Sequence, residues 1–281
     1  MEVVELKHIT KRFGETVANN DVSLSVNSGE ILSILGENGS GKTTLMNMIA
    51  GIYRPDEGQI FINGQEVAIH SPKDAYKYKI GMVHQHYKLV NVFTAAENII
   101  LGQEGKQILD MSTVKAEINK ICDSYGFKLN LDQKIYDMSV SEKQTVEIIK
   151  VLYKGVDILI LDEPTAVLTP QETKSLFDVL RNMRAAGKSV IIITHKLNEV
   201  MEISDRVSVL RKGVYIDTVK TSETSIQALT EMMVGQKIDL DIERSMPVNS
   251  RDILKIEGLT CYNKEGLKAL DNVTFTAKSG E

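Results

Sequence analysis

The stretch GENGSGKT at residues 36–43 combines glycines, a lysine and a hydroxyl residue in the pattern G-x-x-x-x-G-K-[ST]. It follows the apolar run EILSIL and precedes KTTLMNMIAG, so the pattern lies between a predicted strand and a predicted helix. Glycines let the backbone curl until successive amides face phosphate oxygens, and the start of a helix adds partial positive charge. Lys42 would bind the β- and γ-phosphates of a nucleotide, and the Thr43 hydroxyl would bind Mg²⁺. The predicted nucleotide-binding residues here are Gly36, Glu37, Asn38, Gly39, Ser40, Gly41, Lys42, Thr43 and Thr44.

Two neighbouring acids follow a second apolar run, in DILILDEP. A continuous apolar run of this length is typical of a buried parallel strand, which would place Asp162 at the strand end. Asp162 would hold Mg²⁺ together with Thr43, and Glu163 is a candidate general base that polarises the attacking water. A pair of solvated acids is the alternative, and the phosphate loop favours the catalytic interpretation. The stretch NKIC has Cys122 where a guanine-specific N-K-x-D motif needs an aspartate, so ATP is the expected nucleotide.

The composition is that of an ordinary globular protein, with 281 residues, 42% hydrophobic residues and a net charge of −5. This mild acidity argues against a nucleic-acid partner, because nucleic-acid-binding domains usually carry a basic face. Two cysteines provide neither a disulfide framework nor a metal-ligand spacing. The sequence has no apolar run long enough to cross a bilayer, so work at a membrane would require docking on another protein.

Strands and helices alternate around these motifs, which predicts an α/β nucleotide-binding core. From Thr94 to about Val151 the apolar spacing is helical, which indicates a helical insertion. TAAE at 94–97 and TPQE at 169–172 have the form of capping boxes at helix starts. We expect a nucleotide-binding domain over residues 1–237, with a helical subdomain at about 87–155, and a linker at 238–250.

The end of the chain repeats its beginning. ILKIEGLTCYNKEGLKALDNVTFTAKSGE aligns with VVELKHITKRFGETVANNDVSLSVNSGE if one residue is inserted. The chain is therefore expected to hold the first half of a tandem protein, with residues 251–281 forming the N-terminal fragment of a second domain of the same kind. So few residues bury too little surface to fold as an independent domain.

The ordered motifs resemble those of ATP-binding cassette (ABC) ATPases, and the resemblance covers essentially the whole chain. It implies a P-loop NTPase core with an antiparallel β subdomain and an α-helical subdomain. In MVHQH, Gln85 occupies the position of a glutamine that senses Mg²⁺ and the transporter. In IITHK, His195 occupies the position of a histidine that contacts the γ-phosphate, and in KRFG, Phe13 that of an aromatic residue that stacks on adenine.

More narrowly, LGENGSGKTTLMN, GMVHQHYKLV and LDEPTAVLTPQE resemble the tandem ATPase subunits of simple-sugar and nucleoside importers. The motifs HQHYKLV and AVLTPQE favour the nucleoside branch, with a ribose- or galactose-type sugar importer as the alternative. The resemblance implies Mg²⁺-dependent ATP hydrolysis at the cytoplasmic face of a bacterial membrane. The implied partners are a second cassette in the same polypeptide, transmembrane permease subunits and, indirectly, a solute-binding protein or lipoprotein. A coupling helix of the permease would dock around residues 85–102.

Two segments depart from the family pattern. The signature Leu-Ser-Gly-Gly-Gln reads MSVSE at residues 138–142, so Ser139 is kept, Val140 and Ser141 replace glycines, and Glu142 adds negative charge. In the family this segment begins a helix that faces the γ-phosphate bound by the opposite cassette. Thr169 occupies the position of the D-loop aspartate. We therefore expect two unequal ATP sites, of which the one that uses MSVSE is weakened.

Other ABC classes fit less well. Soluble tandem ABC proteins that act on ribosomes use a long charged helical linker, whereas the expected linker here is short. Chromosome and repair ATPases insert long coiled coils between the phosphate loop and the acidic strand, and this interval has no sustained heptads. A nucleotide sensor that does not hydrolyse ATP would not need Glu163 beside the Mg²⁺ ligand.

Overall fold

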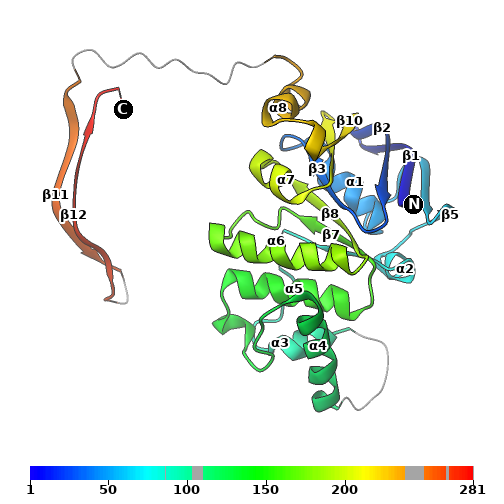
Figure 1. The fold of residues 1–281 in the computed structure, drawn as a ribbon, viewed down its shortest axis with the longest axis horizontal. Helices are drawn as coiled ribbons and strands as arrows, with labels where there is room; N and C mark the ends of the chain where they lie inside the picture. The colour runs from blue at the N-terminus through cyan, green and yellow to red at the C-terminus, as the bar shows by residue number, and fades with distance from the viewer. Residues whose placement is uncertain (86, 103–109, 238–249, 264–265, 281) are drawn as a thin grey trace. The chain divides into compact units, whose positions relative to one another are not determined.

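The computed structural model describes residues 1–85, 87–102, 110–237, 250–263 and 266–280 (Figure 1). Most of the expected linker and the final Glu281 lie outside these residues. The chain divides into two compact units, residues 1–238 and 239–281.

A central sheet of six strands organises the first unit, in the order β10-β9-β3-β8-β7-β6. The neighbours from β9 to β6 run parallel, and β10 pairs antiparallel with β9. Every residue of β3, β6, β7 and β8 is buried, as expected for parallel strands that are covered on both faces. The bounds are β3 Ile31–Leu35, β6 Ile80–Val83, β7 Ile158–Asp162, β8 Ser189–Thr194, β9 Arg206–Arg211 and β10 Val214–Lys220.

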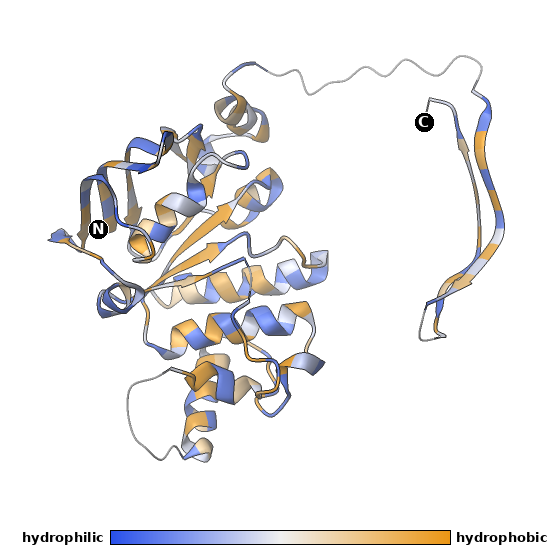
Figure 2. Ribbon diagram, turned by 180° about the vertical axis from the view of Figure 1, so that it is seen from behind, coloured by the Kyte–Doolittle hydropathy of each residue, from blue (hydrophilic) through white to orange (hydrophobic). Residues whose placement is uncertain are grey.

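A smaller antiparallel sheet and one helix cover the first face of the central sheet. This sheet has the order β2-β1-β4-β5. Successive strand residues point to opposite faces, so alternate residues such as Ile160 and Ile191 enter this core with Leu6 and Leu45. Figure 2 shows the hydrophobic colouring of the central strands. The bounds are β1 Glu2–Phe13, β2 Thr16–Asn27, α1 Lys42–Ile49, β4 Glu57–Ile62 and β5 Gln65–Val67.

Helices cover the opposite face. The other residues of the same strands, such as Leu159 and Val190, pack with Val146 and Phe177 in a second core. A third, smaller core joins β9 to α7 and α8 through residues such as Val200 and Leu229. The bounds are α2 Pro72–Lys77, α3 Ala95–Ile100, α4 Met111–Tyr125, η1 Ile135–Asp137, α5 Val140–Tyr153, α6 Pro170–Ala185, α7 Leu197–Ile203, η2 Thr221–Glu223 and α8 Ile226–Val234.

Capping boxes fix the starts of three of these helices. The two that the sequence predicts are present, at Thr94–Glu97 before α3 and at Thr169–Glu172 before α6. A third, at Ser139–Glu142, begins α5 inside the altered signature segment. In each box the hydroxyl accepts a backbone N–H and the carboxylate returns to the capping residue, so two exposed donors are satisfied together.

The second unit is a hairpin of two antiparallel strands, β11 (Asp252–Tyr262) and β12 (Lys268–Lys278). Its register repeats that of β1 and β2. Leu254, Ile256 and Leu259 face Ala277, Phe275 and Val273, in the places where Val4, Leu6 and Ile9 face Val26, Leu24 and Val22.

The irregularities of the hairpin repeat as well. Positive φ angles occur at His8 and Asp21 in the first copy and at the matching Gly258 and Asn272 in the second. In both copies these backbone amides donate to a hydroxyl on the facing strand, as His8 does to Ser23 and Gly258 does to Thr274, at 2.9 Å. The sequence repeat is therefore also a structural repeat.

The two copies differ in burial. Val4 is 1% exposed, whereas the matching Leu254 is 48% exposed. Within the described residues of its own unit, the second hairpin has no counterpart of α1 and β4 to cover its apolar residues.

Truncation of Ile191 to alanine tests the role of the central sheet. Ile191 is fully buried on β8, so Ile191→Ala should lower the free energy of unfolding by about 2–5 kcal/mol through lost burial and a cavity. The matched control is Val214→Ala on the exposed part of β10, with an expected change within about 0.5 kcal/mol. Urea denaturation measures both, and equal losses for the two variants would contradict this account of the core.

Candidate active site

The phosphate loop connects the end of β3 to α1, as its sequence predicts. Gly41 has φ +91°, and a Cβ atom there would lie 2.3 Å from the carbonyl oxygen of Ala18, so only glycine fits. Asn19 donates from its side chain to the Gly41 carbonyl at 3.2 Å, which ties the loop to β2. The buried Ser40 hydroxyl has no hydrogen-bond partner among the described residues. A buried hydroxyl without a partner among the described residues fits a site that receives phosphate oxygens.

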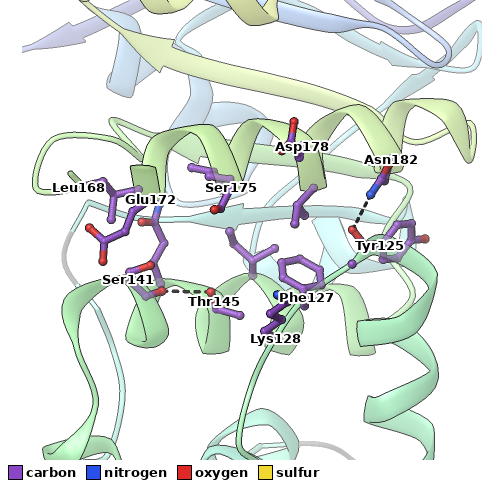
Figure 3. A pocket seen from close by; sticks show the side chains of 15 residues that line it. Tyr125, Phe127, Lys128, Ser141, Thr145, Leu168, Glu172, Ser175, Asp178 and Asn182 are labelled. Carbon is purple, nitrogen blue, oxygen red and sulfur yellow. Dashed lines mark hydrogen bonds between the residues drawn. The ribbon is translucent and has the colours of Figure 1, made fainter. Parts of the chain in front are cut away.

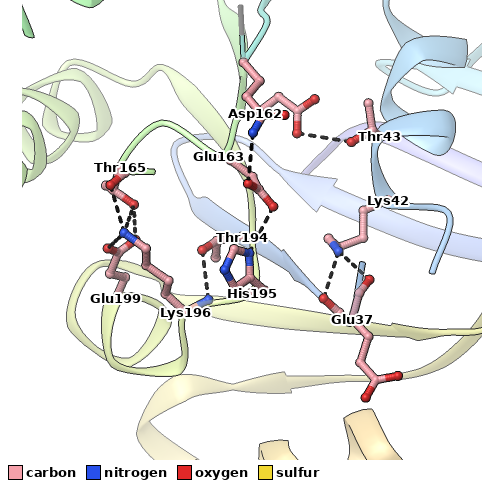
Figure 4. Close-up of polar contacts among 12 residues, drawn as sticks. Glu37, Lys42, Thr43, Asp162, Glu163, Thr165, Thr194, His195, Lys196 and Glu199 are labelled. Carbon is pink, nitrogen blue, oxygen red and sulfur yellow. Dashed lines mark hydrogen bonds and ion pairs between the residues drawn. The ribbon is translucent and has the colours of Figure 1, made fainter. Parts of the chain in front are cut away.

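Lys42 lies inside this loop. Its side chain is buried, and its Nζ donates to the carbonyls of Gly36 and Glu37 at 2.8 Å each (Figure 4). Burial lowers the pKa of Lys42, while the charges of Glu163, Asp162 and Glu37 act in the opposite direction. The ammonium group is therefore held beside the loop, where it can meet a phosphate.

Asp162 ends β7 and meets the start of α1. Thr43 donates from its hydroxyl to the Asp162 carboxylate at 3.2 Å. Burial raises the pKa of Asp162, and the hydrogen bond from Thr43 acts against that shift. A hydroxyl and a carboxylate are oxygen ligands of the kind that Mg²⁺ prefers, with phosphates and water completing its shell. Among the described residues there is no group of three or more His, Cys, Asp or Glu side chains that could hold a metal ion.

Glu163 brings two further predicted residues into the site. Its carboxylate lies 3.0 Å from His195 Nδ1 and accepts from Gln85 Nε2 at 3.3 Å. The backbone of Glu163 has φ +46°, a conformation that residues with side chains rarely adopt, and its N–H donates to the Ile193 carbonyl at 2.9 Å. Figure 4 shows the His195 ring beside the Glu163 carboxylate.

A hollow of about 400 Å³ joins most of these groups. It also contains Thr16, Val17 and Ala18 of β2, which sequence reasoning missed because no motif marks them. The predicted residues that line it are Asn38, Gly39, Ser40, Gly41, Lys42, Thr43, Thr44, Gln85, Asp162 and Glu163. Gly36, Glu37 and His195 contact lining residues through the hydrogen bonds described above.

Phe13 lies at the end of β1, outside the lining of this hollow. It is 44% exposed and packs edge-on against Tyr53, with ring centroids 5.2 Å apart. The Lys11 Nζ lies over the ring, 5.4 Å from its centroid. The stacking of Phe13 on adenine stays a prediction.

The altered signature segment is not among the residues that line the hollow. Ser139, Val140 and Glu142 are at the start of α5 and at least partly exposed. Ser141 lines a different cavity of about 330 Å³ between α5 and α6, opposite Glu172 and Ser175 (Figure 3).

Comparison with known proteins agrees with this geometry. The model of the ABC transporter family matches residues 19–166, from β2 to the segment after β7. The chain belongs to the ABC transporter family. The family and the α/β fold expected from the sequence are thus confirmed. Among the described residues of this ABC chain, none of the helices has the length and apolar character that crossing a membrane requires.

Curated relatives of the ABC chain are import ATP-binding proteins. It is 43% identical over 281 residues to the nucleoside import ATP-binding protein NupA of Lactococcus lactis subsp. cremoris, covering 99% of this chain and 56% of that protein. It is 44% identical to the guanosine import ATP-binding protein NupO of Bacillus subtilis, covering 99% and 55%. It is 40% identical to the ribose import ATP-binding protein RbsA of Caldanaerobacter subterraneus, covering 99% and 56%. The chain spans about half the length of these relatives.

Solved structures of ABC cassettes share the fold. An ATP-binding cassette in its ADP conformation superposes with a TM-score of 0.73 at 26% identity, over 83% of this chain and 95% of that one. A nucleotide-free cassette gives a TM-score of 0.73 at 27% identity, over 84% and 96%.

The burial of the Asp162 carboxylate predicts how the Tm of the nucleotide-free ABC chain without Mg²⁺ depends on pH. The pKa of Asp162 is higher in the folded state than in the unfolded state, so the charged carboxylate lowers the stability of the fold at pH values above the folded pKa. When the pH falls below the unfolded pKa, the carboxyl group is neutral in both states and this loss of stability disappears. Asp162→Asn should therefore raise Tm at pH 7, and its advantage should shrink as the pH approaches 3.8, the ordinary aspartate value.

Asp157→Asn is the matched control. Burial raises the pKa of Asp157, but hydrogen bonds from Lys188 and Lys79 outweigh it, so this pKa lies below its usual value. Removing that charge should lower Tm at pH 7. Thermal denaturation monitored by circular dichroism measures both variants, and a lower Tm for Asp162→Asn at pH 7 would contradict the prediction.

Proposed function

We propose that this chain is the ATP-hydrolysing, energy-coupling part of an ABC importer for nucleosides. The single observation that carries the ATPase proposal is the hollow that joins Lys42, Thr43, Asp162 and Glu163, with His195 on the Glu163 carboxylate. The names of NupA and NupO support nucleosides as the solute class. The resemblance to the ribose import protein RbsA keeps simple-sugar import as the second candidate.

Each group has a definite task in this proposal. The loop amides and Lys42 bind the phosphates of ATP, and Phe13 stacks on the adenine. Thr43, Asp162 and Gln85 are the protein ligands expected for Mg²⁺, which when bound would neutralise charge on the phosphates. Glu163 accepts a proton from water as the water attacks the γ-phosphorus, and His195 orients the Glu163 carboxylate and meets the γ-phosphate. ADP and inorganic phosphate are the products.

The proposed partners follow from the repeat and from exposed apolar residues. The second copy of the β1–β2 hairpin supports a second cassette in the same polypeptide. Val92, Phe93 and Leu101 are exposed near α3, which supports this stretch as the place where a permease subunit docks. The complex would then work at the cytoplasmic face of a bacterial membrane with a solute-binding protein on the other side, and no nucleic acid would take part.

Replacing Glu163 by glutamine tests the ATPase proposal. Glu163→Gln keeps the size of the side chain but cannot accept a proton, so the turnover of ATP should fall roughly 10²- to 10⁴-fold while the Kd for ATP is kept. Phosphate release and binding of a fluorescent ATP analogue measure the two quantities. Lys42→Ala is the contrasting variant, which should lose binding itself. Unchanged turnover in Glu163→Gln would remove this residue as the base.

We further propose that Glu142 weakens the second composite site. In the capping box of α5, the Glu142 carboxylate accepts the Ser139 N–H at 2.7 Å, and the Ser139 hydroxyl accepts the Glu142 N–H at 3.2 Å. The start of this 14-residue helix therefore already holds an anion. A phosphate from the opposite cassette would meet like charge there, and the cap would have to open.

Glu142→Gln tests this asymmetry, because glutamine preserves the capping box and removes the charge. In a Glu163→Gln background, ATP-dependent association of two copies of the chain should strengthen roughly tenfold, or about 1.4 kcal/mol. Glu97→Gln is the matched control, since Glu97 and Thr94 form the same box with the same 2.7 Å contact on α3. Sedimentation velocity measures the association. The asymmetry would be contradicted if both variants strengthened association equally, or if neither did. A second test places LSGGQ at 138–142 in a protein with both cassettes, and unchanged ATP turnover there would also contradict the asymmetry.

A further inference from the structure

Three polar side chains form a closed ring behind the pair of Glu163 and His195. The Lys196 Nζ donates to the Thr165 carbonyl at 2.8 Å, to the Thr165 hydroxyl at 3.2 Å and to the Glu199 carboxylate at 3.0 Å. The Thr165 hydroxyl donates to the other Glu199 oxygen at 2.5 Å. An ammonium group has three N–H donors, so each of them has an acceptor here. Figure 4 shows the ring beside His195.

The ring is partly shielded from water and balanced in charge. Thr165 is 2% exposed and the Glu199 side chain is largely buried, whereas the Lys196 side chain is 37% exposed. The positive charge of Lys196 lies against the negative charge of Glu199, and each polar atom of the ring makes a hydrogen bond. Polar networks that are fully satisfied in this way hold one arrangement of the groups they connect.

The ring connects the two loops that carry the catalytic pair. Glu163 precedes Thr165 by two positions, with Pro164 and its fixed φ between them. His195 directly precedes Lys196. The ring therefore joins the segment after β7 to the segment after β8, next to the 3.0 Å contact between Glu163 and His195. It also restrains the segment in which Glu163 adopts its unfavourable φ of +46°.

Local helix stability explains Lys196 only in part, because its i, i+3 ion pair with Glu199 supports the first turn of α7 but its side chain does not cap the helix. It is the N-cap residue of α7 and makes no side-chain cap hydrogen bond there. Lysine is a poor N-cap, and its positive charge opposes the partial positive charge of a helix start. A residue that breaks a local rule while completing a partly buried network beside catalytic groups points to a role in the site.

We propose that Thr165, Lys196 and Glu199 are positioning residues for the activation of water. They hold the Glu163 carboxylate and the His195 imidazole in one mutual orientation, so that the base and the group facing the γ-phosphate act together. This inference rests on the proposed ATPase function.

Kinetics of a protein with both cassettes give the first test. Lys196→Met and Thr165→Val should each lower kcat roughly 10- to 100-fold, because small displacements of catalytic groups are costly, while KM and the Kd for ATP stay within about twofold. Thr165→Ser, which keeps the hydroxyl, should restore most of kcat. Lys220→Met is the control, since it removes a lysine from another i, i+3 pair, with Glu223 at 2.8 Å, away from the site. Wild-type kcat in Lys196→Met, or equal losses in kcat and ATP affinity, would overturn the proposal.

A spectroscopic measurement decides the same question without turnover. The imidazole ¹⁵N resonance of His195, assigned by its loss in His195→Gln, reports the contact with Glu163. In Lys196→Met it should move toward its position in Glu163→Ala, and in Lys220→Met it should not move. An unmoved resonance in Lys196→Met overturns the positioning role. If the protein with both cassettes hydrolyses no ATP, the ATPase proposal fails on its own, and the resonance still shows whether the ring positions His195.

Discussion

Both faces of the central sheet must be covered, and the rest of the first unit follows from that requirement. In β3, β7 and β8 every residue is buried, and alternate residues supply two separate cores. Because these strands are parallel neighbours, their carboxyl ends lie at one edge, with Leu35 beside Thr194 and Asp162 beside Ile193. The phosphate loop follows the end of β3, Glu163 follows the end of β7, and His195 follows the end of β8. The packing of the sheet therefore determines the geometry of the site.

The site is stabilised by this scaffold rather than by its own contacts. It contains a buried lysine, a buried aspartate whose pKa is raised by burial, a hydroxyl with no hydrogen-bond partner in the described part of the chain, and a glutamate with positive φ. Each of these features costs free energy in the nucleotide-free chain. Functional groups that wait for a ligand commonly carry such costs, and rigid strands on both sides allow them to persist.

Motifs that are local in sequence could be predicted, and contacts between distant segments could not. The loop at 36–43 and the acids after β7 were recognised because their chemistry is fixed by neighbouring residues and by the elements on either side. Thr16, Val17 and Ala18 were missed because they reach the site only through the pairing of β1 with β2 and the packing of β2 on the loop. The ring of Thr165, Lys196 and Glu199 was missed because a lysine at a helix start suggests nothing from sequence alone.

The repeated hairpin has a consequence for folding. A chain with two copies of one hairpin offers two competitors for a single docking position on α1, and such exchange is a known route to misassembly in repeat proteins. Among the differences between the copies, one concerns a contact with the phosphate loop. Asn19 of β2 donates to the carbonyl of Gly41 in the phosphate loop, and its counterpart in β12 is Leu270. A hairpin with leucine at that position would leave the Gly41 carbonyl without this donor, so the hydrogen bond favours the hairpin that carries Asn19.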